Sequence, residues 1–112
     1  MLAVNKTGDI LQGTLDLLIL KTLELGPMHG VAIADRLDQL SRGVFSVGPG
    51  SLFPALHRLA GKGWIEGKWS EVEGRRVKTY TLTPSGAVQL KQEKRNWKKI
   101  LVAMDRVLVA EA

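Results

Sequence analysis

The stretch from Ser46 to Gly63 restricts the fold of this chain more than any other part of the sequence. Leucines stand there at i, i+4 and i+7 with an alanine beside them, so they form one stripe of a helix. Pro49 suits the start of a helix, where its missing N–H costs nothing. We therefore expect a short helix that is buried on one side. The stripe consists of Leu52, Ala55, Leu56 and Leu59.

The opposite side of this helix is small, polar and basic, with one aromatic ring. Its residues are Ser51, Phe53, His57, Arg58 and Lys62. A helix of this kind is suited to lie in a groove of DNA. An ordinary amphipathic surface helix has the same pattern, so the neighbouring elements must decide between the two.

The length of 112 residues is that of one compact unit, and the absence of cysteine excludes disulfide bonds and thiolate metal sites. The N-terminal residues lack the pattern of a signal peptide, and no apolar run is long enough to span a bilayer. We therefore expect a cytoplasmic protein with no membrane partner. His29 and His57 have no carboxylate pair beside them, so we expect no enzyme activity, catalytic residue, cofactor or metal site.

The net charge of +5 is unevenly distributed along the chain. Residues 1–56 contain four Lys and Arg against five Asp and Glu, whereas residues 57–112 contain twelve against six. A localised basic excess marks a surface that is suited to a polyanion, although solvated basic surfaces are also common.

Two helices are expected in the N-terminal half, after a loose arm over residues 1–12. The first runs from Gly13 to about Leu25 with Thr14 as its cap, and leucines cover nearly every side of it. A helix that is apolar all round must be covered on all sides, so part of it is expected to meet a second subunit. The second helix covers residues 28–40, with His29 as a cap or a packed ring and Leu40 on its inner side.

Two strands are expected after the helix in the stretch from Pro49 to Gly63. The runs W-I-E-G-K-W and V-K-T-Y-T-L-T are rich in aromatic and β-branched residues, and the polar loop between them has Gly74 at its turn. Arg75 and Arg76 would lie at the tip of this wing with Lys78 close behind, where such residues contact phosphates or the minor groove. We expect the two glutamates of the loop either to offset Arg75 or Arg76 in the free protein or to point sideways. The sequence thus predicts an α+β, mainly helical fold, a winged helix-turn-helix.

A long helix is expected from Pro84 to the C-terminus, with Thr83 as its cap. Apolar residues recur along it at spacings of three and four, and the basic residues lie mostly off this seam. Such a seam requires a partner helix, either the same helix or the first helix of a second subunit, so we expect a homodimer. We divide the chain into a DNA-binding part, residues 1–83, and a dimerisation helix, residues 84–112. The seam consists of Leu90, Trp97, Ile100, Leu101, Met104, Val107 and Leu108.

Several blocks of the sequence resemble the PadR-type transcriptional regulators, in particular the short subclass with a single C-terminal helix. They are G-T-L-D-L-L-I-L-K-T-L, G-P-M-H-G, G-S-L-F-P-A-L-H-R-L, K-G-W-I and G-R-R-V-K-T-Y-T-L-T-P-S-G. The blocks occur in the order of the family and cover roughly residues 11–110. Two positions depart from the family pattern, because Phe53 and Thr79 stand where tyrosine is usual.

The resemblance implies a dimeric repressor that binds double-stranded DNA at a palindromic operator. Its DNA-facing residues would be Ser51, Phe53, Pro54, His57 and Arg58 on the helix, and Arg75, Arg76 and Lys78 on the wing. Phe53 offers packing or a thymine-methyl contact, but not the phenolic hydrogen bond of a tyrosine.

The resemblance also implies a planar effector at the dimer interface of some members, beside a tryptophan of the last helix. Trp97 matches that tryptophan, and Ile100, Leu101 and Leu18 would line the site. Simple packing of the seam explains the same residues. The alternative to DNA binding is a winged-helix module that docks another protein, but such a module has no need for the basic residues gathered on one side.

Overall fold

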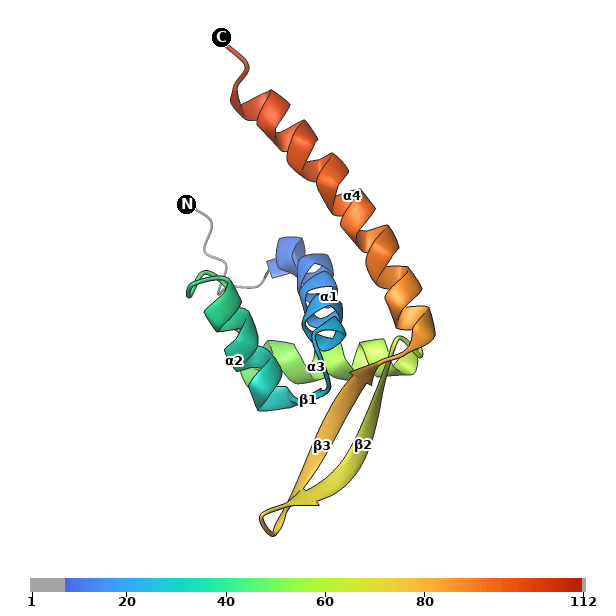
Figure 1. The fold of residues 1–112 in the computed structure, drawn as a ribbon. Coiled ribbons are helices and arrows are strands. Elements are labelled where there is room, and N and C mark those ends of the chain that lie inside the picture. Colours follow the sequence, from blue (N-terminus) through green and yellow to red (C-terminus); the bar gives the residue numbers. More distant parts are fainter. Residues whose placement is uncertain (1–7, 112) are drawn as a thin grey trace.

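The computed structural model describes residues 8–111 of the chain, with side chains described from residue 13 onwards. This part contains four helices and a three-stranded antiparallel sheet with the strand order β1-β3-β2 (Figure 1). The architecture confirms the predicted α+β winged helix-turn-helix. The elements are α1 (Gly8–Glu24), β1 (Met28–His29), α2 (Gly30–Leu40), α3 (Pro49–Gly61), β2 (Ile65–Val72), β3 (Arg75–Leu82) and α4 (Pro84–Leu108).

Helix α1 begins earlier than the sequence predicts. It starts at Gly8, so Thr14 lies inside the helix and is not its cap. The isolated Gly13 indicated a helix start, but a single glycine is tolerated inside a helix at a modest cost. Of the loose arm expected over residues 1–12, residues 1–7 lie outside the described part and residues 8–12 belong to α1.

The single chain covers most of the apolar surface of α1. This helix packs against α2, α3, α4 and β3, and it lies at the centre of the arrangement in Figure 1. Five of its aliphatic side chains are buried, Leu18 is half-buried and Leu25 is 47% exposed. Leu18 and Leu25 are thus what remains of the apolar surface that was expected to meet a second subunit. The buried side chains are Leu15, Leu17, Ile19, Leu20 and Leu23.

Helix α2 is capped by the imidazole of His29. The Nδ1 atom accepts a hydrogen bond from the backbone N–H of Ala32 at 3.3 Å, which confirms the capping role. The backbone of Met28 and His29 pairs with β3, a strand that the sequence did not predict because two residues are too short to show an alternating pattern. At the other end of α2, Leu40 is 57% exposed, so its predicted inward position was wrong.

Helix α3 confirms the apolar stripe from which its position was predicted. All four stripe residues are at most 2% exposed, and Pro49 occupies the first turn after the cap residue Gly48. An ion pair connects the other side of the helix to α1. The Nη2 atom of Arg58 donates to Oδ1 of Asp16 at 2.5 Å, and both side chains are largely shielded from solvent.

The hairpin of β2 and β3 is longer than expected, with eight residues in each strand. Its turn consists of Glu73 and Gly74 alone, and both have positive φ angles, 51° and 78°. This is the backbone of a two-residue hairpin turn whose twist matches that of the strands. The register places Val72 opposite Arg75, so most of the expected polar loop is strand.

Helix α4 is attached to the base of the hairpin by a dense set of hydrogen bonds. The hydroxyls of Thr83 and Ser85 donate to the carbonyl of Gly63 at 2.6 and 2.9 Å, and the N–H of Thr83 donates to the carbonyl of Trp64 at 3.1 Å. The hydroxyl of Thr83 also accepts from the N–H of Gly86, which confirms it as the helix cap. A Cβ atom on Gly86 would overlap the carbonyl oxygen of Trp64. Only glycine therefore fits this joint.

Beyond the joint, α4 packs on α1 and then leaves the body of the molecule (Figure 1). Leu90 is fully buried, Trp97 is half-buried, and Lys94 lies 3.7 Å from the carboxylate of Glu24 on α1. Every residue from 98 to 111 is exposed. The helix ends at Leu108 and does not continue to the C-terminus as predicted.

Replacement of Gly86 by alanine is expected to lower the free energy of unfolding by about 1–3 kcal/mol, the cost of overpacking a close contact. Urea unfolding followed by circular dichroism measures the difference. Gly61→Ala is the matched control, because a Cβ atom there meets nothing within 4 Å. Equal stability of the two variants would contradict the close contact at Gly86.

Removal of the carboxylate in Asp16→Ala is expected to cost roughly 1–3 kcal/mol of unfolding free energy, because the shielded guanidinium of Arg58 loses its partner. Glu24→Ala is the control. It removes an exposed carboxylate that accepts a hydrogen bond from Lys21, whose ammonium lowers the pKa of that carboxyl. Exposed pairs contribute below about 1 kcal/mol, so the loss should be smaller. Similar losses in urea unfolding would show that the Asp16–Arg58 pair is not shielded in solution.

Candidate nucleic-acid interface

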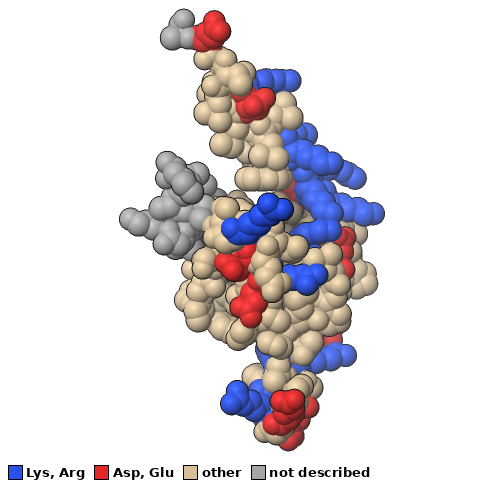
Figure 2. Space-filling model, turned by 60° about the vertical axis from the view of Figure 1, so that its left-hand side comes forward, with Lys and Arg blue, Asp and Glu red and all other residues tan. Residues whose placement is uncertain are grey.

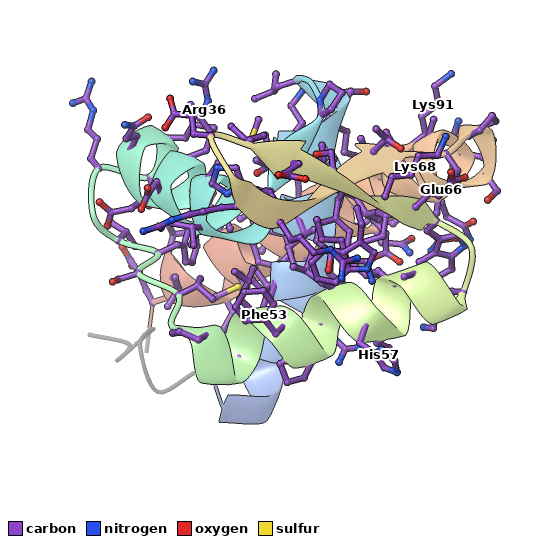
Figure 3. All side chains as sticks on the ribbon, turned by 90° about the horizontal axis from the view of Figure 1, so that it is seen from below. Arg36, Phe53, His57, Glu66, Lys68 and Lys91 are labelled. Carbon is purple, nitrogen blue, oxygen red and sulfur yellow. The ribbon has the colours of Figure 1, made fainter. Side chains whose placement is uncertain are left out.

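The outer side of α3 presents an aromatic ring and an imidazole. Phe53 is 46% exposed, His57 is exposed, and Figure 3 shows both on α3. The ring of Phe53 also touches the start of α2, where a Cβ atom on Gly30 would lie 2.9 Å from its Cε1 atom. Phe53 is therefore fixed against α2 on one side and open to solvent on the other. The neighbouring Pro54 is exposed and Ser51 is half-buried.

The two basic residues predicted on α3 have partners within the chain. Arg58 is held by Asp16 of α1, so its guanidinium is not free on the outer side of the helix. Lys62 lies just beyond α3, with its ammonium 4.6 Å from the ring centre of Trp64. The helix therefore presents a polar and aromatic outer side, and the basic side chains predicted to accompany it are turned to other contacts.

The three basic residues predicted on the wing do not share one side of the hairpin. Side chains alternate along a strand, so Arg76, Lys78 and Tyr80 lie on one face of β3 and Arg75 lies on the other. The face of Arg76 runs into the core at Tyr80, which is 7% exposed. We call this face, which adjoins the body of the protein, the inner face of the wing.

The outer face of the wing points away from α3. It carries Glu66 and Lys68 of β2, which Figure 3 shows on the side of the hairpin that is remote from α3, whereas Glu71, opposite Arg76 in the register, belongs to the inner face. Glu66 and Lys68 lie 3.5 Å apart in an exposed ion pair. The inner face of the wing is therefore turned to the side of the hairpin on which α3 lies (Figure 3).

An exposed tryptophan lies at the centre of the inner face. Trp69 is 58% exposed and stands opposite Lys78 in the register of the hairpin. The guanidinium carbon of Arg76 lies 4.7 Å from the ring centre of Trp69, and the ammonium of Lys78 lies 5.6 Å from it. Trp69 is not among the DNA-facing residues predicted from the sequence. The signal that could have identified it is the turn at Glu73 and Gly74, which sets the register and hence the partners of each strand residue.

Of the two alternatives expected for the glutamates of the wing, the first, an ion pair with the arginines, does not occur in the structure. Glu71 stands opposite Arg76 in the register and Glu73 lies in the turn. Within the residues that the structure describes, neither glutamate forms an ion pair with Arg75 or Arg76. Arg76 lies over the Trp69 ring instead, so its N–H groups are not occupied by a carboxylate.

A further group of basic residues lies on α4. Figure 2 shows Lys and Arg side chains along this helix and others on the wing, with acidic side chains at the wing tip. The apolar seam lies on another side of α4 and is about half exposed in its middle part, with values of 46% for Ile100, 49% for Leu101 and 48% for Met104. Such a row of exposed apolar residues is unusual for a helix surface that has no partner.

The four residues predicted to bind an effector have different environments in the single chain. Trp97 and Leu18 are half-buried and pack against the core, whereas Ile100 and Leu101 are about half exposed. A cavity between them would need a wall from a second chain. In residues 8–111, no group of three His, Asp or Glu side chains is placed to hold a metal ion. None of the helices described here has both the length and the apolar character needed to cross a membrane.

Comparison with solved structures places this arrangement among transcriptional regulators. A transcriptional regulator from Clostridium thermocellum superposes with a TM-score of 0.83 and 25% identity, over 88% of this chain and 97% of that one. A PadR-like transcriptional regulator from Bacillus cereus gives a TM-score of 0.79 and 27% identity, over 93% and 100%. A PadR family transcription regulator from Clostridium difficile gives a TM-score of 0.71 and 32% identity, over 83% and 96%.

Comparison of sequences agrees with this result. The transcriptional regulator Rv3488 of Mycobacterium tuberculosis is 39% identical over 68 residues, which span 61% of each protein. A 37.1 kDa protein of transposon TN4556 from Streptomyces fradiae is also 39% identical, but the match spans only 21% of its length. Residues 19–92 match the transcriptional regulator PadR-like family. The match covers more than half of the chain, and the chain therefore belongs to this family of transcriptional regulators, not to a family of enzymes.

Proposed function

We propose that this protein is a homodimeric repressor that binds a palindromic operator in double-stranded DNA. The observation that carries the proposal is the combination of α3, which has an exposed polar and aromatic outer side, with a following hairpin whose inner face carries cations. An α-helix fits the major groove, and basic residues on an adjacent hairpin can hold the flanking phosphates. Membership of a family of transcriptional regulators supports the same reading.

Within this proposal, α3 reads bases and the wing holds the backbone. His57 can donate or accept a hydrogen bond at a base edge, and the exposed edge of Phe53 can contact a thymine methyl group. Ser51 and Pro54 lie at the same end of α3 as Phe53 and would contact the DNA beside it. We assign no DNA contact to Arg58, because its guanidinium is bound to Asp16 and connects α3 to α1.

The basic residues outside α3 would contact phosphates. Arg76 and Lys78 would contact phosphates from the inner face of the wing. Arg75, on the other face, would contact phosphates of the DNA backbone near the wing tip. Lys62, at the end of α3, would meet the backbone at the edge of the groove. Such contacts set orientation and affinity but carry little sequence information.

Dimerisation would use the seam of α4. The exposed apolar residues from Ile100 to Leu108 recur at helical spacing, and burying them against a second copy removes them from water. Residues 1–83 would then form the DNA-binding part and residues 84–112 the dimerisation helix. The two α3 helices of a dimer would enter major grooves about one helical turn apart, as two-fold symmetry requires.

A planar apolar effector would fit the same seam. A second chain would close the space around Trp97, Ile100, Leu101 and Leu18, and apolar walls of this kind favour a flat apolar ligand. Such a ligand would lower operator affinity by as much as it prefers the dimer geometry that cannot bind DNA. Ligand-dependent release of the operator would make the protein a responsive repressor.

Selection of bound duplexes from a random pool, at near-physiological salt, is expected to enrich an inverted repeat. On that repeat, His57→Ala should relax base preference at one position of each half-site, with about 1–3 kcal/mol at stake per lost base contact. The double variant Arg75→Ala with Arg76→Ala should instead weaken all duplexes alike. It should also reduce the salt dependence of log K by about 0.9 for each lost phosphate contact.

A pool that stays random, with binding that disappears as salt rises, would contradict sequence-specific recognition. The complete absence of salt-dependent binding to any duplex would favour a module that docks another protein. A change of base preference in the wing variant, with none in His57→Ala, would reverse the roles of the wing and α3.

Leu101→Lys is expected to weaken the dimer about 100-fold or more, because two buried leucines are lost from a symmetric interface. Sedimentation equilibrium measures the dissociation constant. Val102→Lys is the matched control. Val102 is 50% exposed and Leu101 is 49% exposed, but Val102 lies on the side of α4 that carries Lys91 and Arg95. If both variants remain dimeric to the same degree, the seam is not the interface.

A further inference from the structure

We propose that Trp69 is a positioning residue of the DNA interface, which holds the Arg76 guanidinium on the inner face of the wing before DNA is bound. The inference rests on the proposed function above and names how the wing is prepared for it. Trp69 is the last residue of the run W-I-E-G-K-W that indicated a strand, and the role proposed for it follows from its position in the hairpin.

The exposure of Trp69 is the first observation. The indole is 58% exposed and lies on the same face as Tyr80, which is in the core. A tryptophan that stabilised the fold by burial would be largely removed from solvent. Trp69 therefore contributes less to the core than its size allows, and its open ring face is available to other groups.

The cations beside the ring are the second observation. Arg76 lies 4.7 Å and Lys78 lies 5.6 Å from the ring centre, distances at which a cation is attracted to the indole face. Lys78 is also 5.7 Å from the ring of Tyr80, and its stem passes so close to Gly67 that a Cβ atom there would lie 2.5 Å from Cε. The inner face thus carries a continuous row of rings and cations from the core towards the wing tip.

The chemistry of the guanidinium makes this row suitable for a phosphate. Stacking uses the flat face of Arg76, so the N–H donors at its edge remain available for a phosphate oxygen. The nearest carboxylate in the register, that of Glu71, is not paired with it. The arginine is therefore ordered without being neutralised.

Ordering in the free protein has a consequence for affinity. A long side chain that becomes fixed only on binding loses rotamer freedom at that moment, which opposes association. Stacking on Trp69 removes part of that loss in advance. Without the indole, Arg76 would extend from an exposed part of the hairpin with nothing to direct it towards the side of α3.

The first test compares wing variants on the duplex selected for the wild-type protein. Trp69→Ala should weaken binding about 3- to 10-fold, the effect of one side chain that is no longer ordered beforehand. Trp69→Phe keeps an aromatic face and should stay within about 3-fold of the wild type. Val72→Ala is the control, since Val72 is 53% exposed on the outer face of the same hairpin, and it should bind like the wild type.

A double-variant comparison distinguishes positioning from direct contact. If Trp69 acts through Arg76, adding Trp69→Ala to Arg76→Ala should weaken binding by less than about 2-fold further, the part left to Lys78. Losses that multiply in full would overturn the proposal, because Trp69 would then act on its own. Circular dichroism of each variant shows whether the hairpin is still folded.

A measurement on the free protein separates this inference from the proposed function. The Hε resonance of Arg76 should be shifted upfield by the indole ring in the wild type and in Trp69→Phe in the same direction, but not in Trp69→Ala. No upfield shift in the wild type overturns the inference. If the wild type binds DNA and Trp69→Ala binds equally well, the inference fails while the proposed function stands; if the wild type binds no duplex, both fail.

Discussion

The burial of α1 is the constraint on which the rest of the structure depends. Its leucines and isoleucine lie between α2, α3, β3 and α4, so this helix separates and orients the elements of the interface. The Asp16–Arg58 pair adds a directional contact between α1 and α3, because a charge-assisted hydrogen bond requires a defined geometry. The outer side of α3 is consequently held in a fixed relation to the wing and to α4.

Features that depend on neighbouring residues could be predicted from the sequence. The buried stripe of α3 and the cap at Thr83 follow from spacings within one or two helical turns, and the structure has both. Strand β1 could not be predicted, because its two residues are extended only through their pairing with β3. The predicted start of α1 was wrong for a different reason. Gly13 lies inside the helix, because a single glycine does not end a helix when the flanking residues favour it.

In the candidate site, too, the features set by neighbouring residues could be predicted and those set by distant residues could not. The helical period was sufficient to place Phe53 and His57 on the outer side of α3. The partner of Arg58 is 42 residues away in the sequence, on another helix, and no local pattern indicates it. On the wing, the position of the turn decides which residues share a face, and Glu73 occupies a left-handed conformation that glycine or asparagine adopts more readily. Arg75 and Arg76 were therefore assigned to one surface although they lie on two.

The joint at Gly86 couples the orientation of the hairpin to that of α4. The carbonyls of Gly63 and Trp64, just before β2, accept the hydrogen bonds that start α4, and the close contact at Gly86 leaves little slack between them. From the rise per residue, α4 extends about 38 Å from this joint and the hairpin extends about 26 Å. A tilt at the far end of α4 would swing the wing tip by about two thirds of that displacement. Because Leu90 of α4 and Ile65 and Tyr80 of the hairpin are buried in the core, such a swing would also have to shift their contacts with the rest of the core.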